Sequence, residues 1–587
     1  MGSESGITAS TKAEPRLDAA AVFYVSFGLA WTIILFGAMF YLWRKRHLPS
    51  LAIRGLPLTF ASVICLHLYW MLVQVCIVIG PIEPEVGEYW VMGTWLPWGI
   101  SLFYAANAQL LHVAKVQKRF AHNQNVSEST IMEESTNKSQ RSKSWWRTRY
   151  QRFMQKSYAS RVWILTSIAM IVQFLLTLLM YLISRKYHAS WGIPGTEVHG
   201  TAMERKVEQG RGWEWWPGVA VQVFWSWVVA PVVLWRSRHI RDTHGWRLQT
   251  IACCVSGMPA TPMWLIALNV PGMEPCNHYF IPPQWIALSI WFIEIFTVFV
   301  PVWEVKKHQG LQEETLDAIA QWESKGQKNV SLSEFSGSTD VVSPMSDSFK
   351  KAPSCEIALD DLFRKSNESS PESLYTMTAL NRTLAHDPEP LRIFSALRDF
   401  SGENIAFLTS VASWDALWSS HPSVGSSNSG NGAVIADDLF RRTMFKHAVC
   451  IYARFVSQAH ADVPVNIVGG HRERLDQVFG PAAQVLFGEG RGESYSDMPF
   501  EYLFGSPAEK QAVHVSSKVN DVVAQRVQWW GDIPDEFDAN VFRDAERSVK
   551  YLVLTNTWPK YVKEMIELRR KESKPIRQQR RGWWFRR

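Results

Sequence analysis

The chain has 587 residues, a net charge of +7 and 47% hydrophobic residues. Its mean hydropathy of −0.09 averages a very apolar first half and a polar second half, so local windows decide the class of protein. The charge pattern does not indicate a nucleic-acid partner. The seven cysteines have neither the paired spacing of a zinc site nor the density of a disulfide scaffold, and we predict no metal or cofactor.

Seven apolar runs in the first half are each long enough to cross a bilayer, whose core of about 30 Å needs about 20 helical residues. They are Ala19–Trp43, Leu56–Gly80, Tyr89–Leu111, Val162–Ile183, Trp216–Leu234, Ile251–Val270 and Tyr279–Trp303. The first run is too long for the core of a signal peptide, so we expect the mature protein to retain it. The sequence therefore predicts an extracellular segment 1–18 and a seven-helix transmembrane bundle over 19–303.

Basic residues in the loops set the predicted orientation, because Lys and Arg resist translocation. The loops after the first, third and fifth runs hold nineteen Lys and Arg, whereas the loops on the other side hold five. This places the N-terminus outside and everything after Trp303 in the cytosol. Five glycosylation sequons then fall on the cytosolic side and are expected to be unmodified. They begin at Asn125, Asn137, Asn329, Asn367 and Asn381.

Polar residues inside the runs mark a candidate intramembrane site, since polarity in hydrocarbon is costly. Glu294 is the strongest case. It either contacts a ligand or an ion, or makes a fixed hydrogen bond to a neighbouring helix through His67 or Asn107. Prolines inside the runs are expected to kink their helices. They are Pro97, Pro231, Pro259, Pro262 and Pro301.

Residues 304–373 form the predicted connection to the second half. Apolar residues at helical spacing over Val302–Lys325 indicate that a helix continues off the membrane. From Gly326 to Ser373 the chain is rich in Ser and charged residues, which favours a mobile linker. This linker is either a phosphorylated regulatory segment or a simple tether.

Helical periodicity returns over 374–568, where three stretches carry a family resemblance. The first is Phe400-Ser401-Gly402-Glu403-Asn404-Ile405-Ala406-Phe407. The second is Ile451–Ser457 followed by Val465-Asn466-Ile467, and the third runs from Phe542 to Val562 with Thr557-Trp558-Pro559-Lys560-Tyr561 near its end. In this order they resemble the regulator-of-G-protein-signalling (RGS) family. Seven-span proteins with a C-terminal RGS domain, as in plants and fungi, share the whole layout.

The resemblance implies an all-helical cytosolic domain that accelerates GTP hydrolysis by a Gα subunit without supplying a chemical group. The chain is thus a predicted GTPase-activating protein rather than an enzyme with its own catalytic residues. By position, the resemblance implies Gα contacts at Glu403, Asn404, Asn466, Leu552, Asn556 and Lys560. Local bonding in a loop or cap is the alternative for the asparagines Asn404 and Asn466, and a core position is the alternative for Leu552.

The chain departs from the family pattern in several places. Asn556 stands where the family usually has Asp, Lys560 where it has Arg, and Leu408 where it has Trp. The first change removes a charge and the second a bidentate fork. A long insertion is predicted at about 468–540. The basic, aromatic tail 569–587 either lies on anionic lipid or is a disordered tail.

The predicted function is that of a membrane-anchored regulator of heterotrimeric G-protein signalling, placed at the plasma membrane. An extracellular signal sensed by the bundle would control access of the domain to Gα. The alternative is a catalytically weak Gα-binding scaffold or a G-protein-coupled receptor. The sequence names neither the ligand of the bundle nor the particular Gα.

Overall fold

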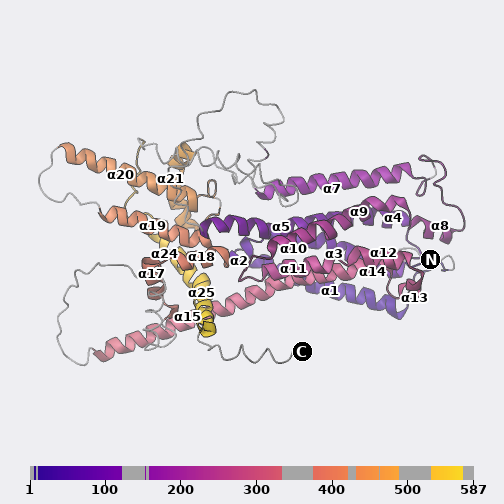
Figure 1. Cartoon of the computed structure of the whole chain (residues 1–587), viewed down its shortest axis with the longest axis horizontal. Helices are drawn as coiled ribbons and strands as arrows, with labels where there is room; N and C mark the ends of the chain where they lie inside the picture. The colour runs from indigo at the N-terminus through magenta and orange to yellow at the C-terminus, as the bar shows by residue number, and fades with distance from the viewer. Residues whose placement is uncertain are drawn as a thin grey trace, which may run out of the picture. The chain divides into compact units, whose positions relative to one another are not determined.

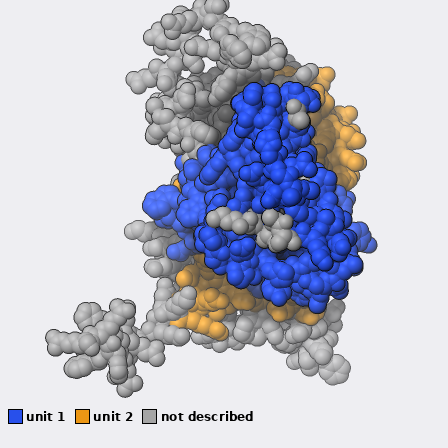
Figure 2. Space-filling model, turned by 90° about the vertical axis from the view of Figure 1, so that its right-hand side faces the viewer, with its two compact units in different colours: residues 1–115, 138–305, 492–517 blue, residues 116–137, 306–491, 518–587 orange. Residues whose placement is uncertain are grey.

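A computed structural model describes residues 6–7, 11–121, 153, 158–188, 190–333, 374–420, 431–461, 463–487 and 531–572. These residues form helices, and their only β-type pairing is an isolated bridge between Ser184 and Ile193. The predicted all-α class is therefore confirmed for the described part of the chain. The chain divides into two compact units, shown in blue and orange in Figure 2. Unit 1 comprises Met1–Lys115, Lys138–Val305 and Gly492–Ser517, and unit 2 comprises Val116–Asn137, Lys306–Arg491 and Lys518–Arg587.

Unit 1 is built from long apolar helices joined by short ones (Figure 1). The helices are α1 (Ala19–Arg44), α2 (Pro49–Ala52), α3 (Leu56–Ile79), α4 (Glu85–Trp90), η1 (Val91–Trp95), α5 (Leu96–Ala121), α7 (Tyr158–Ile183), α8 (Ala202–Gln209), η3 (Trp213–Trp215), α9 (Trp216–Val223), η4 (Phe224–Val229), α10 (Ala230–Ser237), α11 (Trp246–Gly257), α12 (Ala260–Asn269), η5 (Pro271–Met273), α13 (Glu274–Asn277), α14 (Pro282–Glu294), η6 (Ile295–Phe299) and α15 (Val300–Ser333). The last residues of α5 and most of α15 belong to unit 2.

Six helical segments among the described residues are long and apolar enough to cross a membrane, which indicates an integral membrane protein. They are Ala19–Arg44, Leu56–Ile79, Ser160–Ile183, Ala202–Ser237, Trp246–Asn269 and Pro282–Asp317. Each overlaps one predicted run. The remaining run, Tyr89–Leu111, lies within continuous helix from Glu85 to Ala121 but is not among the six. Its Trp, Gly, Asn and Gln residues reduce its hydropathy.

Four of the five predicted prolines interrupt the regular helices, whereas Pro262 lies in the first turn of α12 without a break. Short π-helices end two residues before Pro97, Pro231 and Pro301, and a break separates α11 from α12 at Pro259. A proline has no N–H and its ring clashes with the carbonyl four residues earlier, so a wider turn before it relieves the clash. The carbonyl that Pro97 leaves without its helical donor is that of Gly93. It accepts hydrogen bonds from Gln173 and Thr177 of α7, each at 2.7 Å.

Helix α14 is the central element of unit 1, because it packs against α3, α11 and α12. Apolar residues point outward as well as inward on the peripheral helices, as expected where lipid replaces water. On α1, for example, Ile33 is 74% exposed whereas Leu35 is fully buried. Helix α7 likewise exposes Ile171 and Leu175. Burial of apolar residues is therefore a weak guide to structure in this unit, and buried polar residues are the informative ones.

Unit 2 is a helical domain with its own core (Figure 1). Besides α15, its helices are α17 (Met377–His386), α18 (Glu389–Leu397), α19 (Gly402–Ser420), α20 (Asn431–Ile451), η8 (Tyr452–Val456), α21 (Gly469–Phe487), α24 (Arg543–Leu552), η10 (Val553–Thr557) and α25 (Trp558–Glu572). Leu408 is buried in the core.

The structure adds detail to two predicted segments. Helix α15 continues to Ser333, past the predicted end at Lys325. The segment predicted as an insertion at 468–540 begins with α21, whose Val478 and Phe479 belong to the core, and Phe537 near its other end belongs there too. The sequons at Asn125, Asn137 and Asn367, most of the linker 326–373 and the tail beyond Glu572 lie outside the described residues.

Candidate functional site

A tight turn between α18 and α19 carries the first of the three motif stretches. Phe400 in this turn has φ +52°, a left-handed conformation that costs a bulky residue about 1 kcal/mol or more. Burial of its ring and the backbone bond from Ser401 N–H to Ser395 O hold the turn closed. The turn brings the Ser401 hydroxyl to 2.9 Å from Asp399 Oδ2.

The π-helix η10 carries Asn556 in the third stretch. It ends two residues before Pro559, so the proline that belongs to the motif also accounts for the wide turn. The turn buries Asn556 and Thr557, and Lys560 lies one turn further along α25. Two predicted Gα-contact residues, Asn556 and Lys560, therefore lie together, 3.1 Å apart between Nζ and Oδ1.

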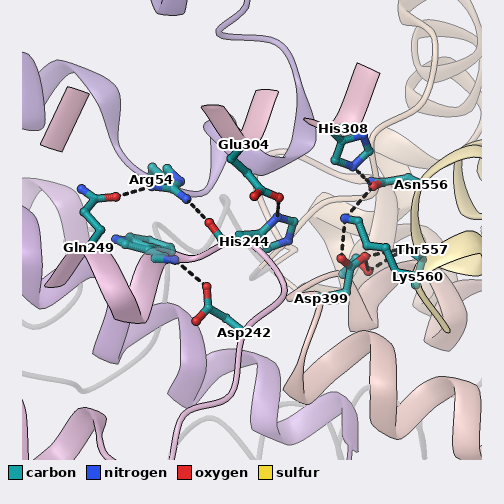
Figure 3. A network of polar contacts seen from close by, with 12 residues as sticks. Arg54, Asp242, His244, Gln249, Glu304, His308, Asp399, Asn556, Thr557 and Lys560 are labelled. Carbon is teal, nitrogen blue, oxygen red and sulfur yellow. Dashed lines mark hydrogen bonds and ion pairs between the residues drawn. The ribbon is translucent and has the colours of Figure 1, made fainter. Parts of the chain in front are cut away.

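These two segments meet at Asp399, a residue that the sequence prediction did not include (Figure 3). Lys560 Nζ donates to Asp399 Oδ1 at 2.7 Å. The hydroxyls of Ser401 and Thr557 lie within hydrogen-bond distance of Asp399 Oδ2 at 2.9 and 2.7 Å. Asp399 is 2% exposed, and an ammonium group with several hydrogen bonds is what a buried carboxylate needs. The cluster ties the first motif stretch to the third.

Glu403 lies in the first turn of α19, also in unit 2, and its partner is Gln117 at the end of α5. Gln117 Nε2 donates to Glu403 Oε2 at 2.8 Å, while Gln117 Oε1 accepts from Gly402 N–H at 2.9 Å. Burial raises the pKa of Glu403 to about 7, although the bond from Gln117 opposes the shift. Near neutral pH the charged and the neutral forms of this carboxyl are therefore both populated.

The other predicted contact residues differ in exposure. Asn404 is 4% exposed, and its Oδ1 has no hydrogen-bond partner among the described residues. Asn466 is exposed between buried Val465 and Ile467, and Val465 N–H donates to Phe455 O at 2.8 Å, so the loop is pinned to the core. Leu552 is half-buried and does not belong to the core cluster.

In unit 1, Glu294 is fully buried and both of its carboxylate oxygens have partners. His67 Nδ1 lies 3.0 Å from Oε1, and Trp31 Nε1–H donates to Oε2 at 2.6 Å. His67 Nε2 lies 3.0 Å from the hydroxyl of Thr32, which also contacts Gly28 O at 2.7 Å. The hydroxyl has one hydrogen, so if it donates to Gly28, the imidazole Nε2 must donate to Thr32. The cluster therefore links α1, α3 and α14.

The structure does not bring Asn107, the third predicted residue of this site, into the Glu294 cluster. Asn107 lines a separate cavity of about 20 Å³ with Arg54 and Gln249, which has room for about one water. Its Nδ2 has no partner among the described residues. The alternative of a fixed hydrogen bond therefore describes His67 in this structure, and not Asn107.

A second polar cluster of unit 1, absent from the sequence prediction, surrounds the buried Arg54 (Figure 3). Its guanidinium donates to Gln249 Oε1 and to His244 O and lies over the Trp246 ring at 5.3 Å. Burial lowers the pKa of Arg54 to about 10, so the group stays charged at neutral pH. His244 Nδ1 lies 3.6 Å from Glu304 Oε1 on α15. A buried arginine gives no periodic signal that could have identified it from the sequence.

Among the described residues, no group of three or more His, Cys, Asp or Glu side chains is placed to hold a metal ion. No known protein-family model matches the chain, and neither the curated proteins nor the solved structures contain a match to it. The motif stretches and their geometry are therefore the basis for assigning a function.

Proposed function

We propose that this protein is a membrane-anchored regulator of heterotrimeric G proteins whose unit 2 is an RGS domain. The observation that carries the proposal is the packing of Phe407. Its ring in the first motif stretch contacts Phe455 in the second at 6.1 Å and Phe542 in the third at 6.3 Å between centroids. The three motif stretches thus share one core, although the first and third are more than a hundred residues apart.

The proposed mechanism is stabilisation of the Gα switch loops. Gα carries its own catalytic Arg and a water-orienting Gln, so what a regulator can add is to hold these loops in their transition-state form. A hundredfold acceleration needs about 2.7 kcal/mol, which a few interfacial hydrogen bonds of roughly 0.5–1.5 kcal/mol can supply. The exposed amide of Asn466, on a loop fixed by its buried neighbours, is the side chain best placed to supply one.

The proposal includes a seventh membrane span and an orientation. The helical run from Glu85 to Ala121 is long enough to cross a bilayer, and its Gly93 carbonyl is capped by Gln173 and Thr177 of a candidate span. With seven spans, the nineteen basic loop residues lie inside and the C-terminal half faces the cytosol, where Gα is found. The plasma membrane is the proposed location.

Single-turnover GTP hydrolysis tests this function. Purified full-length protein in nanodiscs is added to Gα subunits of each class, loaded with GTP, and phosphate release is followed. We expect at least a tenfold acceleration for one class, and a loss of most of it in the Asn466→Ala variant. If wild type and Asn466→Ala give the same rate with every Gα, the wild-type protein does not accelerate GTP hydrolysis, contrary to the proposal.

A Gα-binding scaffold or a receptor with weak GTPase-activating capacity is the second candidate. Asn556 and Lys560 favour it, because an amide and an ammonium replace the charged and bidentate groups usual in the family. The same assay separates the two functions when binding is measured beside it. A scaffold would bind GTP-loaded Gα in an Asn466-dependent way without accelerating hydrolysis.

A further inference from the structure

Three of the six residues proposed to contact Gα are buried in this structure. Glu403, Asn404 and Asn556 are 9%, 4% and 6% exposed, whereas Asn466 is exposed. A side chain can contribute to a protein interface only if the partner can reach it. The segments that cover these residues in unit 2 therefore decide whether the surface is open.

The last turn of α5 covers the start of α19. Gln117 is 1% exposed and uses both ends of its amide, accepting from Gly402 N–H and donating to Glu403. Phe120, on the same turn, packs against the core of unit 2. A Cβ added at Gly402 would come within 2.8 Å of Phe120 Cβ, which shows how closely the two helices approach. This turn occupies the place that a Gα switch loop would need at Glu403.

Helix α15 supplies the second contact, at Asn556. His308 Nε2 is hydrogen-bonded to Asn556 Oδ1, the same oxygen that accepts from Lys560 (Figure 3). The acceptor that Asn556 could offer to a partner is therefore engaged from within the chain. One turn earlier on the same helix, Glu304 lies beside His244 of unit 1. Helix α15 thus carries one polar contact in each unit on successive turns.

We propose that residues 116–121 of α5 and His308 of α15 form an autoinhibitory cover over the Gα-contact surface of unit 2. Gα and the cover compete for Glu403 and Asn556, so binding requires release of the cover. Both covering segments are continuations of helices that begin in unit 1. A conformational change in the bundle can therefore be transmitted along these helices to the cover. This inference rests on the proposed function.

The test measures binding of Gα·GDP·AlF₄⁻ to the full-length protein in nanodiscs, together with single-turnover hydrolysis. The variants are Gln117→Ala, His308→Ala and the two combined. The control is Glu313→Ala, an exposed residue on the same helix α15. Gln117→Glu is a second way to open the α5 contact, because it places a carboxyl against Glu403. Size-exclusion chromatography and circular dichroism confirm that each variant is folded.

We expect each single variant to tighten Gα binding about fivefold and the double variant about twentyfold, since each removes one anchor of the cover. Glu313→Ala should bind like wild type. Adding Asn466→Ala to the double variant should remove the gain, because wild type and the opened variant would bind Gα through the same surface. Gln117→Glu should act in the same direction as Gln117→Ala.

Two negative outcomes are distinguishable. If wild type binds in an Asn466-dependent way and the folded double variant and Gln117→Glu bind no better, the autoinhibitory cover is wrong and the proposed function stands. If neither wild type nor any opened variant binds or accelerates any Gα, the proposed function is wrong, and the inference falls with it.

Discussion

Each unit buries a carboxylate where segments distant in the sequence meet, and the two are satisfied differently. Glu294 in unit 1 is held by an indole N–H and an imidazole, both from other helices of the bundle. Asp399 in unit 2 is held by the Lys560 ammonium and two hydroxyls. Removing the acid leaves an indole N–H and an imidazole nitrogen without a partner in unit 1, and an ammonium group without its counter-ion in unit 2. The Lys560 side chain is 10% exposed, whereas His67 and Glu294 are almost fully buried.

The largest effect is expected for Glu294→Leu. It leaves His67 Nδ1 and the Trp31 N–H without a hydrogen-bond partner in an apolar interior, which should cost about 3–5 kcal/mol of unfolding free energy. The apparent melting temperature of the full chain in detergent measures the loss. Glu294→Gln keeps one acceptor and should lose about half as much. Wild-type stability in Glu294→Leu would mean that the cluster does not hold α1, α3 and α14 together.

Asp399→Ala should have a smaller effect, about 2–4 kcal/mol, because Lys560 can turn its ammonium toward water. The measurement is hydrogen exchange of peptides covering 391–410 and 543–562, which should lose protection together. Thr557→Val, which removes one donor and leaves the ion pair, is the matched control and should cost about 1 kcal/mol. Loss of protection in one peptide alone would show that Asp399 does not join the two segments.

The smallest expected effect is the pH dependence of stability that Glu403 gives to unit 2. The pKa of Glu403 is about 7 in the folded chain against an ordinary value of 4.5. Its contribution to stability is therefore fully present below pH 4.5 and is lost as pH rises through 7, by about 2 kcal/mol between pH 5 and 8. Thermal melts across this range should fall more steeply for wild type than for Glu403→Gln. Parallel curves would show that Glu403 is not buried in solution.

Part of the candidate site was predictable from residues alone. Glu294 stands out because an acid within an apolar run is costly and therefore marks a polar site. The sequence also predicted His67 as its partner. Asp399 directly precedes the first motif stretch but could not be predicted from the sequence. Acids are common in a soluble helical domain, and its partners Thr557 and Lys560 are far along the chain. Asn107 is the converse case. Its polarity in a predicted span correctly indicated a polar site, but that site is the cavity beside Arg54 and not the Glu294 cluster.

The sequence by itself determined what depends on short-range chemistry. Apolar length fixes the helices that can cross a membrane, and the absent proline N–H accounts for the π-turns that precede Pro97, Pro231, Pro301 and Pro559. The tertiary structure decided which polar groups meet. Gln117 and His308 lie more than two hundred residues from Glu403 and Asn556, and neither shows a local pattern, because a hydrogen bond across a core leaves no periodicity in the chain. Whether the predicted Gα-contact residues are open or covered is therefore a property of packing alone.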